Sequence, residues 1–341
     1  MSENILTVKD LKTYFYTASG IAKAVDGVSF NIAKGETMGI VGESGSGKSV
    51  TSSSIIRLLP PRTGKIVGGS IEFEGKDVLA LSKKELNDFR GKDIAVIFQD
   101  PMTSLDPVFK IGKQMTEMIM AHQNVTKDEA WKMSVEALSK VGIPEPEKRM
   151  NSYPYELSGG MCQRVIIAMA VCCKPKLIIA DEPVSALDVS IQSQVLNLMN
   201  QLKRDMNLTY IFVAHDLSVV EHISDRVGVM YLGNFVEEGD KYSLYQNPLH
   251  PYTQALLSAV PIPDPKAKKD RIILEGNIPS ALNPPSGCKF HTRCPKCMER
   301  CKTEAPQKYQ VDDDHFVYCH LYDTEEAKKN AKAAENAVIH Q

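Results

Sequence analysis

The sequence predicts an α/β fold built around a phosphate-binding loop. Residues 42–49 read Gly-Glu-Ser-Gly-Ser-Gly-Lys-Ser, which fits the P-loop pattern G-x-x-x-x-G-K-[ST]. An apolar run at 37–41 precedes the motif and predicts a short buried strand, and a predicted helix at 50–59 follows it. Further apolar runs of strand length end in polar residues, as strands do at the ligand edge of an α/β sheet; they lie at 94–98, 177–180 and 209–214.

The glycines of this loop let the backbone turn tightly and approach an anion without a Cβ in the way. Successive backbone N–H groups and the start of the following helix direct positive potential at phosphate oxygens. Lys48 is placed to reach the β- and γ-phosphates, and the Ser49 hydroxyl to bind Mg²⁺. An ordinary Gly/Ser-rich turn is the alternative, but the full match in a strand-loop-helix context favours binding of a nucleoside triphosphate.

Composition sets broader limits. A chain of 341 residues has room for one large domain with an appendage or for two domains, and 43% hydrophobic residues suffice for a core. A net charge of -2 argues against a dominant nucleic-acid-binding surface. No apolar run reaches the length of a membrane span and the N-terminus has no signal-peptide pattern, so we expect a cytoplasmic location.

The first seventy residues predict a hairpin that carries aromatic side chains. Strands are expected at 5–11 and 24–32, with a turn at Ser19-Gly20, and another turn and strand at 67–73. One aromatic residue of the hairpin is a candidate for stacking on an adenine base, and cross-strand packing is the alternative. The segment from 108 to 150 is expected to be mostly helical, with a buried apolar face.

A second phosphate-binding turn is predicted at 157–164, which reads Leu-Ser-Gly-Gly-Met-Cys-Gln-Arg. Ser158, Gly159 and Gly160 stand at the start of an apolar helix, where backbone N–H groups bind anions. Two such turns in one chain imply either two nucleotides or one nucleotide shared between two chains.

Polar residues that follow buried strands supply the candidate chemistry. Asp181 and Glu182 end an apolar run abruptly before Pro183, which favours a magnesium partner and a base for water over a solvated acidic turn. Gln99 is a candidate ligand contact, or alternatively caps its loop. His215 is a candidate contact of the γ-phosphate, although a lone histidine is usually structural.

In this order the motifs resemble the ATP-binding subunit of ABC transporters, from residue 5 to about 240. The resemblance implies an ABC ATPase fold, with a RecA-like core, an antiparallel β subdomain and a helical subdomain at about 108–170. It also implies a head-to-tail dimer with two ATP molecules between the subunits. Each P-loop would then face the turn at 157–160 of the other chain.

The same resemblance implies roles for individual residues. Glu182 is the catalytic base, assisted by His215 and Lys48. The Mg²⁺ ligands are Ser49, Gln99 and Asp181, and Phe15 stacks on adenine, with Tyr14 or Tyr16 as alternatives. The implied nucleotide contacts are Phe15, Gly42, Glu43, Ser44, Gly45, Ser46, Gly47, Lys48, Ser49, Val50, Gln99, Ser158, Gly159, Gly160, Asp181 and His215.

A finer resemblance points to the peptide and nickel import group of this family. It is carried by the residues at 98–107, by His-Pro-Tyr-Thr at 250–253 and by Pro-Pro-Ser-Gly-Cys at 284–288. It implies two transmembrane permease subunits, a second ATPase subunit and, indirectly, an extracytoplasmic peptide-binding protein. The chain would lie at the cytoplasmic face of the membrane and bind no nucleic acid.

Three questions stay open at this stage. The first half of the chain resembles one of two paired ATPase subunits while 183–239 and the tail resemble the other, so a heterodimer and a homodimer are both compatible. Dipeptide, oligopeptide and nickel cargo are not separated, because the ATPase does not touch the cargo. A soluble ABC ATPase acting on nucleic acid or ribosomes is the competing function, but such members usually carry coiled-coil insertions or tandem cassettes, which this chain lacks.

The C-terminal part of the chain changes composition. We expect an ATP-binding domain at 1–246, a Pro- and Cys-rich extension at 247–325 and a polar helical or disordered tail at 326–341. Its prolines include Pro248, Pro251, Pro261, Pro263, Pro265, Pro279, Pro284 and Pro285.

An extension so rich in loops buries little apolar surface and needs a covalent or metal staple. By resemblance to the tail of peptide importers, four cysteines are expected to hold a 4Fe–4S cluster, with zinc or free thiols as alternatives. They are Cys288, Cys294, Cys301 and Cys319, and Cys297 is an extra thiol.

Overall fold

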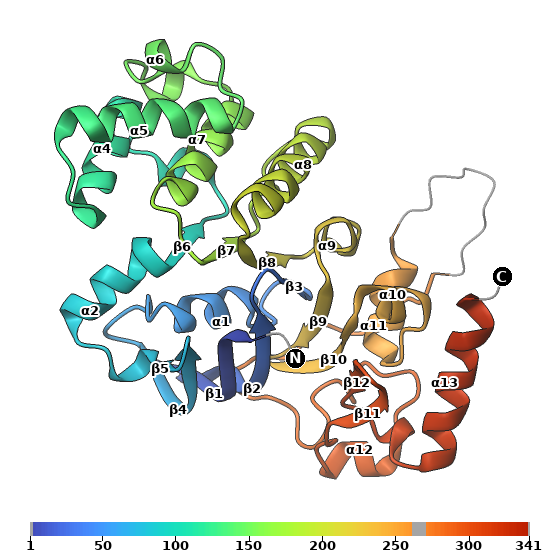
Figure 1. Cartoon of the computed structure of the whole chain (residues 1–341). Coiled ribbons are helices and arrows are strands. Elements are labelled where there is room, and N and C mark those ends of the chain that lie inside the picture. The colour runs from blue at the N-terminus through green and yellow to red at the C-terminus, as the bar shows by residue number, and fades with distance from the viewer. Residues whose placement is uncertain (1–2, 261–270, 340–341) are drawn as a thin grey trace. The chain divides into compact units, whose positions relative to one another are not determined.

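The computed structural model describes residues 3–260 and 271–339. These residues form two compact units, whose elements are labelled in Figure 1. The first unit comprises Ala33–Glu36 and Asp77–Val213, and the second comprises Asn4–Ile32, Thr37–Lys76 and the chain from Ala214 onward.

The second unit begins with a four-stranded sheet in the order β2-β1-β4-β5. The strands are β1 (Asn4–Thr17), β2 (Gly20–Ala33), β4 (Gly64–Phe73) and β5 (Lys76–Asp77). β1 pairs antiparallel with β4, with Leu6 opposite Phe73, and both side chains are buried. The predicted hairpin is therefore confirmed, with its turn closed by Gly20 at φ +128°.

The same unit contains the strand that leads into the P-loop. β3 (Thr37–Val41) is buried along its whole length and pairs parallel with β9 (Arg226–Tyr231), which pairs antiparallel with β10 (Asn234–Asp240). α9 (Leu217–Ile223) packs closely against β3, because a Cβ on Gly39 would lie 2.5 Å from Val220 Cγ1.

The helix after the P-loop is shorter than its sequence predicts. α1 spans Lys48–Ile55, whereas the pattern predicts a helix to residue 59. Arg57 takes a left-handed conformation (φ +54°), its N–H donates to Ser54 O, and the Leu58 N–H donates to Ser53 O at 2.7 Å. These bonds form a Schellman motif, which ends a helix before any proline does.

The C-terminal part of the second unit packs onto its core rather than trailing from it. Its elements are α10 (Lys241–Gln246), α11 (Pro251–Ser258), α12 (Glu299–Thr303), β11 (Tyr309–Asp312), β12 (His315–Val317), a 3₁₀ turn (His320–Tyr322) and α13 (Glu325–Ile339). β12 pairs antiparallel with β10, with Val317 opposite Glu237, and the red hairpin and α13 lie together in Figure 1. A small apolar cluster of Leu249, Val311, Val317 and Cys319 fastens this segment.

The described part of the tail after residue 326 belongs to α13, which extends to Ile339. Pro261, Pro263 and Pro265 lie outside the described residues.

The first unit contains three parallel strands in the order β6-β7-β8, and all three were predicted from apolar runs. β6 spans Ile94–Ile97, β7 Leu177–Asp181 and β8 Thr209–Ala214. Ala180 lies opposite Phe212, and both are fully buried. Because the strands are parallel, their carboxyl ends share one edge of the sheet.

Helices make up the rest of the first unit. They are α2 (Lys83–Asp88), α3 (Pro101–Ser104), α4 (Ile111–His122), α5 (Lys127–Lys140), α6 (Pro146–Arg149), α7 (Gly159–Cys172) and α8 (Val189–Met206), and α4, α5 and α7 pack together in Figure 1. Short 3₁₀ turns occur at Val78–Ala80 and Pro154–Glu156, and a π turn at Phe89–Asp93. A capping box starts α5, in which Thr126 and Glu129 satisfy each other's backbone N–H groups.

The apolar residues at helix-like intervals in this segment are buried to different degrees. Met115, Ile119 and Leu138 are buried, whereas Met118, Trp131 and Val135 are half-buried. Over the described part of the chain, no helix combines the length and the apolar character needed to cross a membrane.

Candidate nucleotide-binding site

The P-loop connects β3 to α1 in the conformation that its glycines require. Gly45 and Gly47 have φ values of +80° and +105°, where side-chain-bearing residues are strained. A Cβ on Gly47 would lie 2.4 Å from the carbonyl oxygen of Ala24, so the position also lacks space for one. Gly47 is the N-cap of α1, and the first N–H groups of this helix therefore belong to the loop.

Lys48 lies along the loop with its side chain buried. Its Nζ donates to Gly42 O at 2.8 Å and to Glu43 O at 3.1 Å. Ser49 is exposed in the first turn of α1, and Val50 beside it is half-buried. The ammonium and the hydroxyl expected to meet phosphate and Mg²⁺ thus stand at the same helix start.

The first unit brings Gln99 and Glu182 together. Gln99 Nε2 donates to Glu182 Oε2 at 3.0 Å, although 83 positions separate them in the chain. Asp181 ends β7 and Glu182 follows it directly. The contact restricts the orientation of the Glu182 carboxylate.

Glu182 has a strained backbone. Its φ is +50°, a conformation that costs a residue with a side chain about 1–3 kcal/mol. The surrounding structure holds it there, because the Glu182 N–H donates to Val213 O at 2.9 Å and Ser185 Oγ donates to Glu182 O at 3.0 Å. Strain at a residue predicted to be catalytic is consistent with a functional constraint on its direction.

The second predicted phosphate-binding turn starts α7. Ser158 is the N-cap and its Oγ accepts from the Met161 N–H at 3.3 Å, while Leu157 is buried and anchors the turn. Gly159 has open space around it, whereas a Cβ on Gly160 would lie 2.7 Å from Ile191 Cγ2. The turn is therefore a surface feature of the first unit, with free approach at Gly159.

The aromatic residues of β1 differ in their surroundings. The Tyr14 hydroxyl donates to Asp26 at 2.7 Å, and burial raises the pKa of this phenol to about 12. Phe15 is half-buried opposite Gly64, and Tyr16 is 41% exposed beneath the Lys65 ammonium. Tyr14 is thus part of a polar network, which leaves Phe15 and Tyr16 as the less constrained rings.

The predicted site residues are distributed over both units. The second unit holds Phe15, the P-loop and His215, which is exposed directly after β8. The first unit holds Gln99, the turn at 157–160, Asp181 and Glu182.

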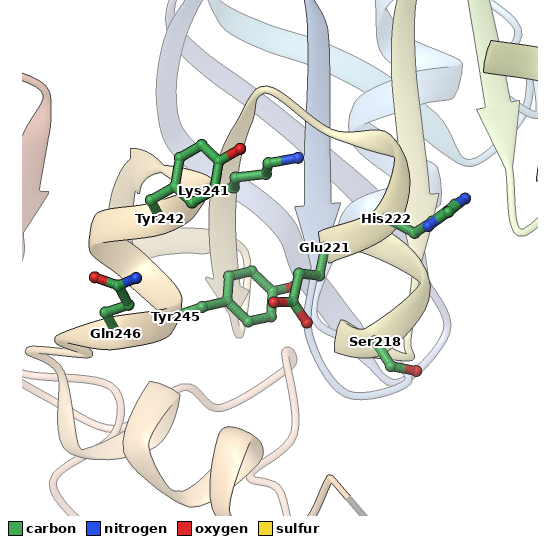
Figure 2. Close-up of a pocket in the computed structure, with 7 residues that line it drawn as sticks. All are labelled: Ser218, Glu221, His222, Lys241, Tyr242, Tyr245 and Gln246. Atoms are coloured by element: carbon green, nitrogen blue, oxygen red, sulfur yellow. The ribbon is translucent and has the colours of Figure 1, made fainter. Parts of the chain in front are cut away.

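A hollow in the second unit lies away from the P-loop residues. It has a volume of about 400 Å³ between α9 and α10 (Figure 2). Its walls include Glu221 and Tyr245, whose hydroxyl donates to Leu217 O at 2.5 Å. No residue of the P-loop lines it, so its size does not make it the nucleotide site.

The cysteines of the C-terminal segment are close neighbours and all are free thiols. Burial raises the pKa of Cys288 to about 11 and of Cys319 to about 12, and in both cases nearby thiols add to the effect. The thiols that act on Cys319 are those of Cys288, Cys294 and Cys301, whereas Cys297 is exposed. Among the described residues, however, no group of three or more His, Cys, Asp or Glu is arranged to hold a metal ion.

Two contacts of the P-loop were not predicted from the sequence. Arg293 forms an ion pair with Glu43, and the Tyr252 hydroxyl accepts from the Glu43 N–H. The His-Pro-Tyr-Thr stretch drew attention to Tyr252 without indicating its role. No local pattern links Arg293 to a loop 250 positions earlier.

Comparison with known proteins extends these observations. The family model described as "ABC transporter" matches residues 25–185, and "Oligopeptide/dipeptide transporter, C-terminal region" matches residues 236–301. The oligopeptide transport ATP-binding protein AppF of Bacillus subtilis is 50% identical, covering 94% of this chain and 98% of that protein. The oligopeptide transport ATP-binding proteins named OppD are 48% identical in B. subtilis (92% and 87% covered) and 48% identical in Escherichia coli (89% and 90% covered).

Solved structures show the same fold. The ATP-binding cassette MJ0796, a dimer bound to ADP and Pi in a post-hydrolysis state, has a TM-score of 0.62 at 27% identity, covering 69% of this chain and 98% of that one. The protein cbiO1 of Clostridium perfringens has a TM-score of 0.62 at 28% identity, covering 72% and 91%.

Proposed function

The chain belongs to the ABC transporter family of ATP-binding proteins, in the group with the oligopeptide/dipeptide C-terminal region, and we propose that it powers import of di- and oligopeptides. Its activity is hydrolysis of ATP to ADP and phosphate, coupled to transport. One observation carries the choice of cargo: relatives named for oligopeptide or dipeptide transport match at 44–50% identity over nearly the whole chain.

We propose that the site residues divide the chemistry among themselves as follows. Lys48 and the P-loop N–H groups hold the phosphates, and Glu182, oriented by Gln99, accepts a proton from the attacking water. His215 contacts the γ-phosphate. The oxygens of Ser49, Gln99 and Asp181 suit a hard cation, so these residues would hold Mg²⁺, which neutralises developing charge on the phosphates.

We also propose a head-to-tail pair of ATPase subunits at the cytoplasmic face of the membrane, bound to two permease subunits. The dimeric state of MJ0796 supports the pairing. The exposure of Ser158 and Gly159 supports it as well, because a turn that serves a partner's nucleotide must be accessible. The partner is a second copy of the chain or a related subunit.

Reconstitution tests the import function. The chain, its permeases and the cognate binding protein are assembled in lipid vesicles, with ATP on the side of the ATPase. We expect labelled di- and tripeptides to accumulate only with hydrolysable ATP. Uptake of Ni²⁺ without uptake of peptides, or ATPase activity that responds to neither, would contradict the proposal.

For the extension at 247–325 we propose a 4Fe–4S cluster held by Cys288, Cys294, Cys301 and Cys319. The donor type suits the group, because thiolates are its ligands. Burial raises the pKa of Cys288, Cys294 and Cys319, and the nearby Cys301 thiol adds to the effect on each of them. When bound, the cluster would crosslink the segment. Its role would be structural, since ATP hydrolysis requires no electrons.

Composition of the purified chain tests the cluster. Protein prepared without oxygen should be brown, absorb near roughly 400 nm and contain iron and sulfide. Colourless protein with one zinc per chain would replace the cluster by a zinc site. Metal-free protein that is fully folded would rule out both.

A further inference from the structure

Glu43 of the P-loop is held through three different groups. Its N–H donates to the Tyr252 hydroxyl at 2.9 Å, and its carbonyl oxygen accepts from Lys48 Nζ at 3.1 Å. Its carboxylate accepts from both terminal nitrogens of Arg293, at 2.7 Å (Nη1) and 3.3 Å (Nη2). The orientation of this residue therefore depends on side chains from the C-terminal part of the chain.

The ion pair between Arg293 and Glu43 is largely buried and has a defined geometry. The Arg293 side chain is only 7% exposed and that of Glu43 is 29% exposed. A two-pronged contact between guanidinium and carboxylate fixes direction as well as distance, unlike the single contact of an exposed ion pair. An Arg at this position therefore restricts the rotation of the Glu43 side chain.

An aromatic cluster fixes Arg293 and Tyr252 in turn. The Arg293 guanidinium lies 6.0 Å from the ring centroid of Tyr231, and the Tyr231 and Tyr252 rings are 4.8 Å apart. Phe290 lies 5.2 Å and 5.4 Å from these two rings and is 1% exposed. The Arg293 guanidinium and the Tyr252 hydroxyl, which both contact Glu43, thus belong to one packed aromatic cluster.

We propose that Arg293 and Tyr252 are positioning residues for ATP, which hold Glu43 so that the P-loop keeps its phosphate-binding conformation. They do not touch the nucleotide. Lys48 depends on the same residue through its bond to the Glu43 carbonyl, so a rotated Glu43 would also displace the ammonium. The competing explanation is that the contacts only dock the C-terminal segment.

ATP affinity separates these explanations. Arg293→Ala in the purified full-length chain should raise the Kd for a fluorescent ATP analogue about tenfold, the scale of one charged hydrogen bond. Arg293→Lys keeps the charge but cannot make the two-pronged contact, so it should rescue only part of the loss. Tyr252→Phe keeps the ring and removes only the acceptor, and should raise the Kd about threefold.

Matched controls exclude a general effect on the segment. Arg300→Ala removes an arginine that pairs with Glu304 and Asp323, and Tyr322→Phe removes a hydroxyl that donates to Leu249 O at 2.9 Å. Both should leave the Kd unchanged. In the assembled transporter, Arg293→Lys should raise KM more than it lowers kcat.

A double-mutant cycle tests the pairing itself. If the pair acts as a unit, Glu43→Gln combined with Arg293→Ala should bind ATP no more weakly than the worse single variant. An unchanged Kd in Arg293→Lys and Tyr252→Phe would overturn the proposal, as would an equal loss in the two controls.

Discussion

Glu182 combines a strained backbone with a side-chain hydrogen bond that Gln99 donates. A carboxylate in this position is expected to accept a proton from water, and an amide in its place cannot. We therefore expect Glu182→Gln to lower ATP turnover by about 10²–10⁴-fold while the Kd for ATP changes little. Steady-state ATPase assays of the assembled transporter and nucleotide binding by the isolated chain measure the two quantities.

Glu182→Gln should also change the oligomeric state. With ATP it should remain dimeric on size-exclusion chromatography, and with ADP it should dissociate. Glu136→Gln, an exposed carboxylate on α5, is the control and should behave as the wild type. Wild-type turnover in Glu182→Gln would remove Glu182 from the catalytic role.

Local residue patterns predicted the P-loop but not what holds it. The loop conformation follows from three glycines within eight consecutive residues, so this short stretch is enough to infer it. The contacts of Glu43 with Tyr252 and Arg293 join positions 209 and 250 residues apart. Only the folded chain brings such groups together, because neither contact leaves a repeating pattern in the sequence.

At the scale of elements, α11 begins with a buried histidine cap. His250 Nδ1 accepts from the Tyr252 N–H at 3.1 Å, which requires an unprotonated Nδ1. Burial lowers the pKa of His250 from 6.5 to about 4, partly opposed by Glu237. The neutral form is thus favoured in the folded chain, so stability is full above pH 6.5 and is lost as the pH falls toward 4.

His250→Asn should flatten this dependence, since asparagine caps a helix without titrating. Between pH 6.5 and 4.5 the wild type should lose up to about 1.4 kcal/mol per pH unit more than the variant. Urea unfolding at several pH values measures the difference. Because His315, which also contacts Glu237, is present in both proteins, identical slopes would contradict the role of His250.

The helical segment of the first unit exposes apolar side chains that its own packing does not use. Val108 is 69% exposed, Phe109 40% and Met120 44%. We expect this surface, together with Gln99, to receive a cytoplasmic helix of a permease. Val108→Ser and Phe109→Ser should then abolish peptide transport while leaving the Kd for ATP within about twofold.

Transport and ATPase assays in the same vesicles check this expectation. Val67→Ser changes an apolar residue of β4 that is 43% exposed, and serves as the control. Loss of ATP binding in the Val108 and Phe109 variants would indicate damage to the fold instead of uncoupling.

Helices and strands could be predicted where the sequence contains a continuous apolar run. The prediction failed for strands that form only because they pair with a strand distant in the sequence. β3, β7 and β8 are continuous buried runs and stood out in the sequence. The strands β11 and β12 have only 4 and 3 residues, and they are stabilised by pairing with each other and by the pairing of β12 with β10. α1 ends earlier than predicted because Arg57 takes a left-handed conformation. A glycine usually marks this conformation in a sequence, and position 57 is not a glycine.

At the scale of the molecule, the C-terminal segment is joined to the core of the second unit at several points. Lys289 pairs with Asp26 at 3.1 Å, β12 pairs with β10, and Arg293 pairs with Glu43. The segment that carries the cysteines therefore also carries a contact of the P-loop, since Arg293 directly precedes Cys294. A change that loosens the packing around the cysteines is therefore expected to weaken ATP binding.

This coupling yields the last prediction. Cys301 and Cys319 are 7% and 8% exposed, and the Cys288 N–H donates to Cys301 O at 2.8 Å, next to the turn that leads to Arg293. Replacing both thiols by serine removes two proposed cluster ligands with little change in volume. We expect a lower melting temperature and a Kd for ATP raised about as much as in Arg293→Ala.

The cysteine substitutions are then combined with Arg293→Ala, and the Kd for ATP is measured. If the cysteines act on ATP through Arg293, then Cys301→Ser and Cys319→Ser should raise the Kd in the wild-type background but not further in Arg293→Ala. Cys297→Ser, at an exposed thiol, is the control and should change neither quantity. A lower melting temperature with an unchanged Kd would show that the cysteines stabilise the segment without affecting the P-loop. Additive losses would mean that they reach the nucleotide by a route other than the ion pair between Arg293 and Glu43.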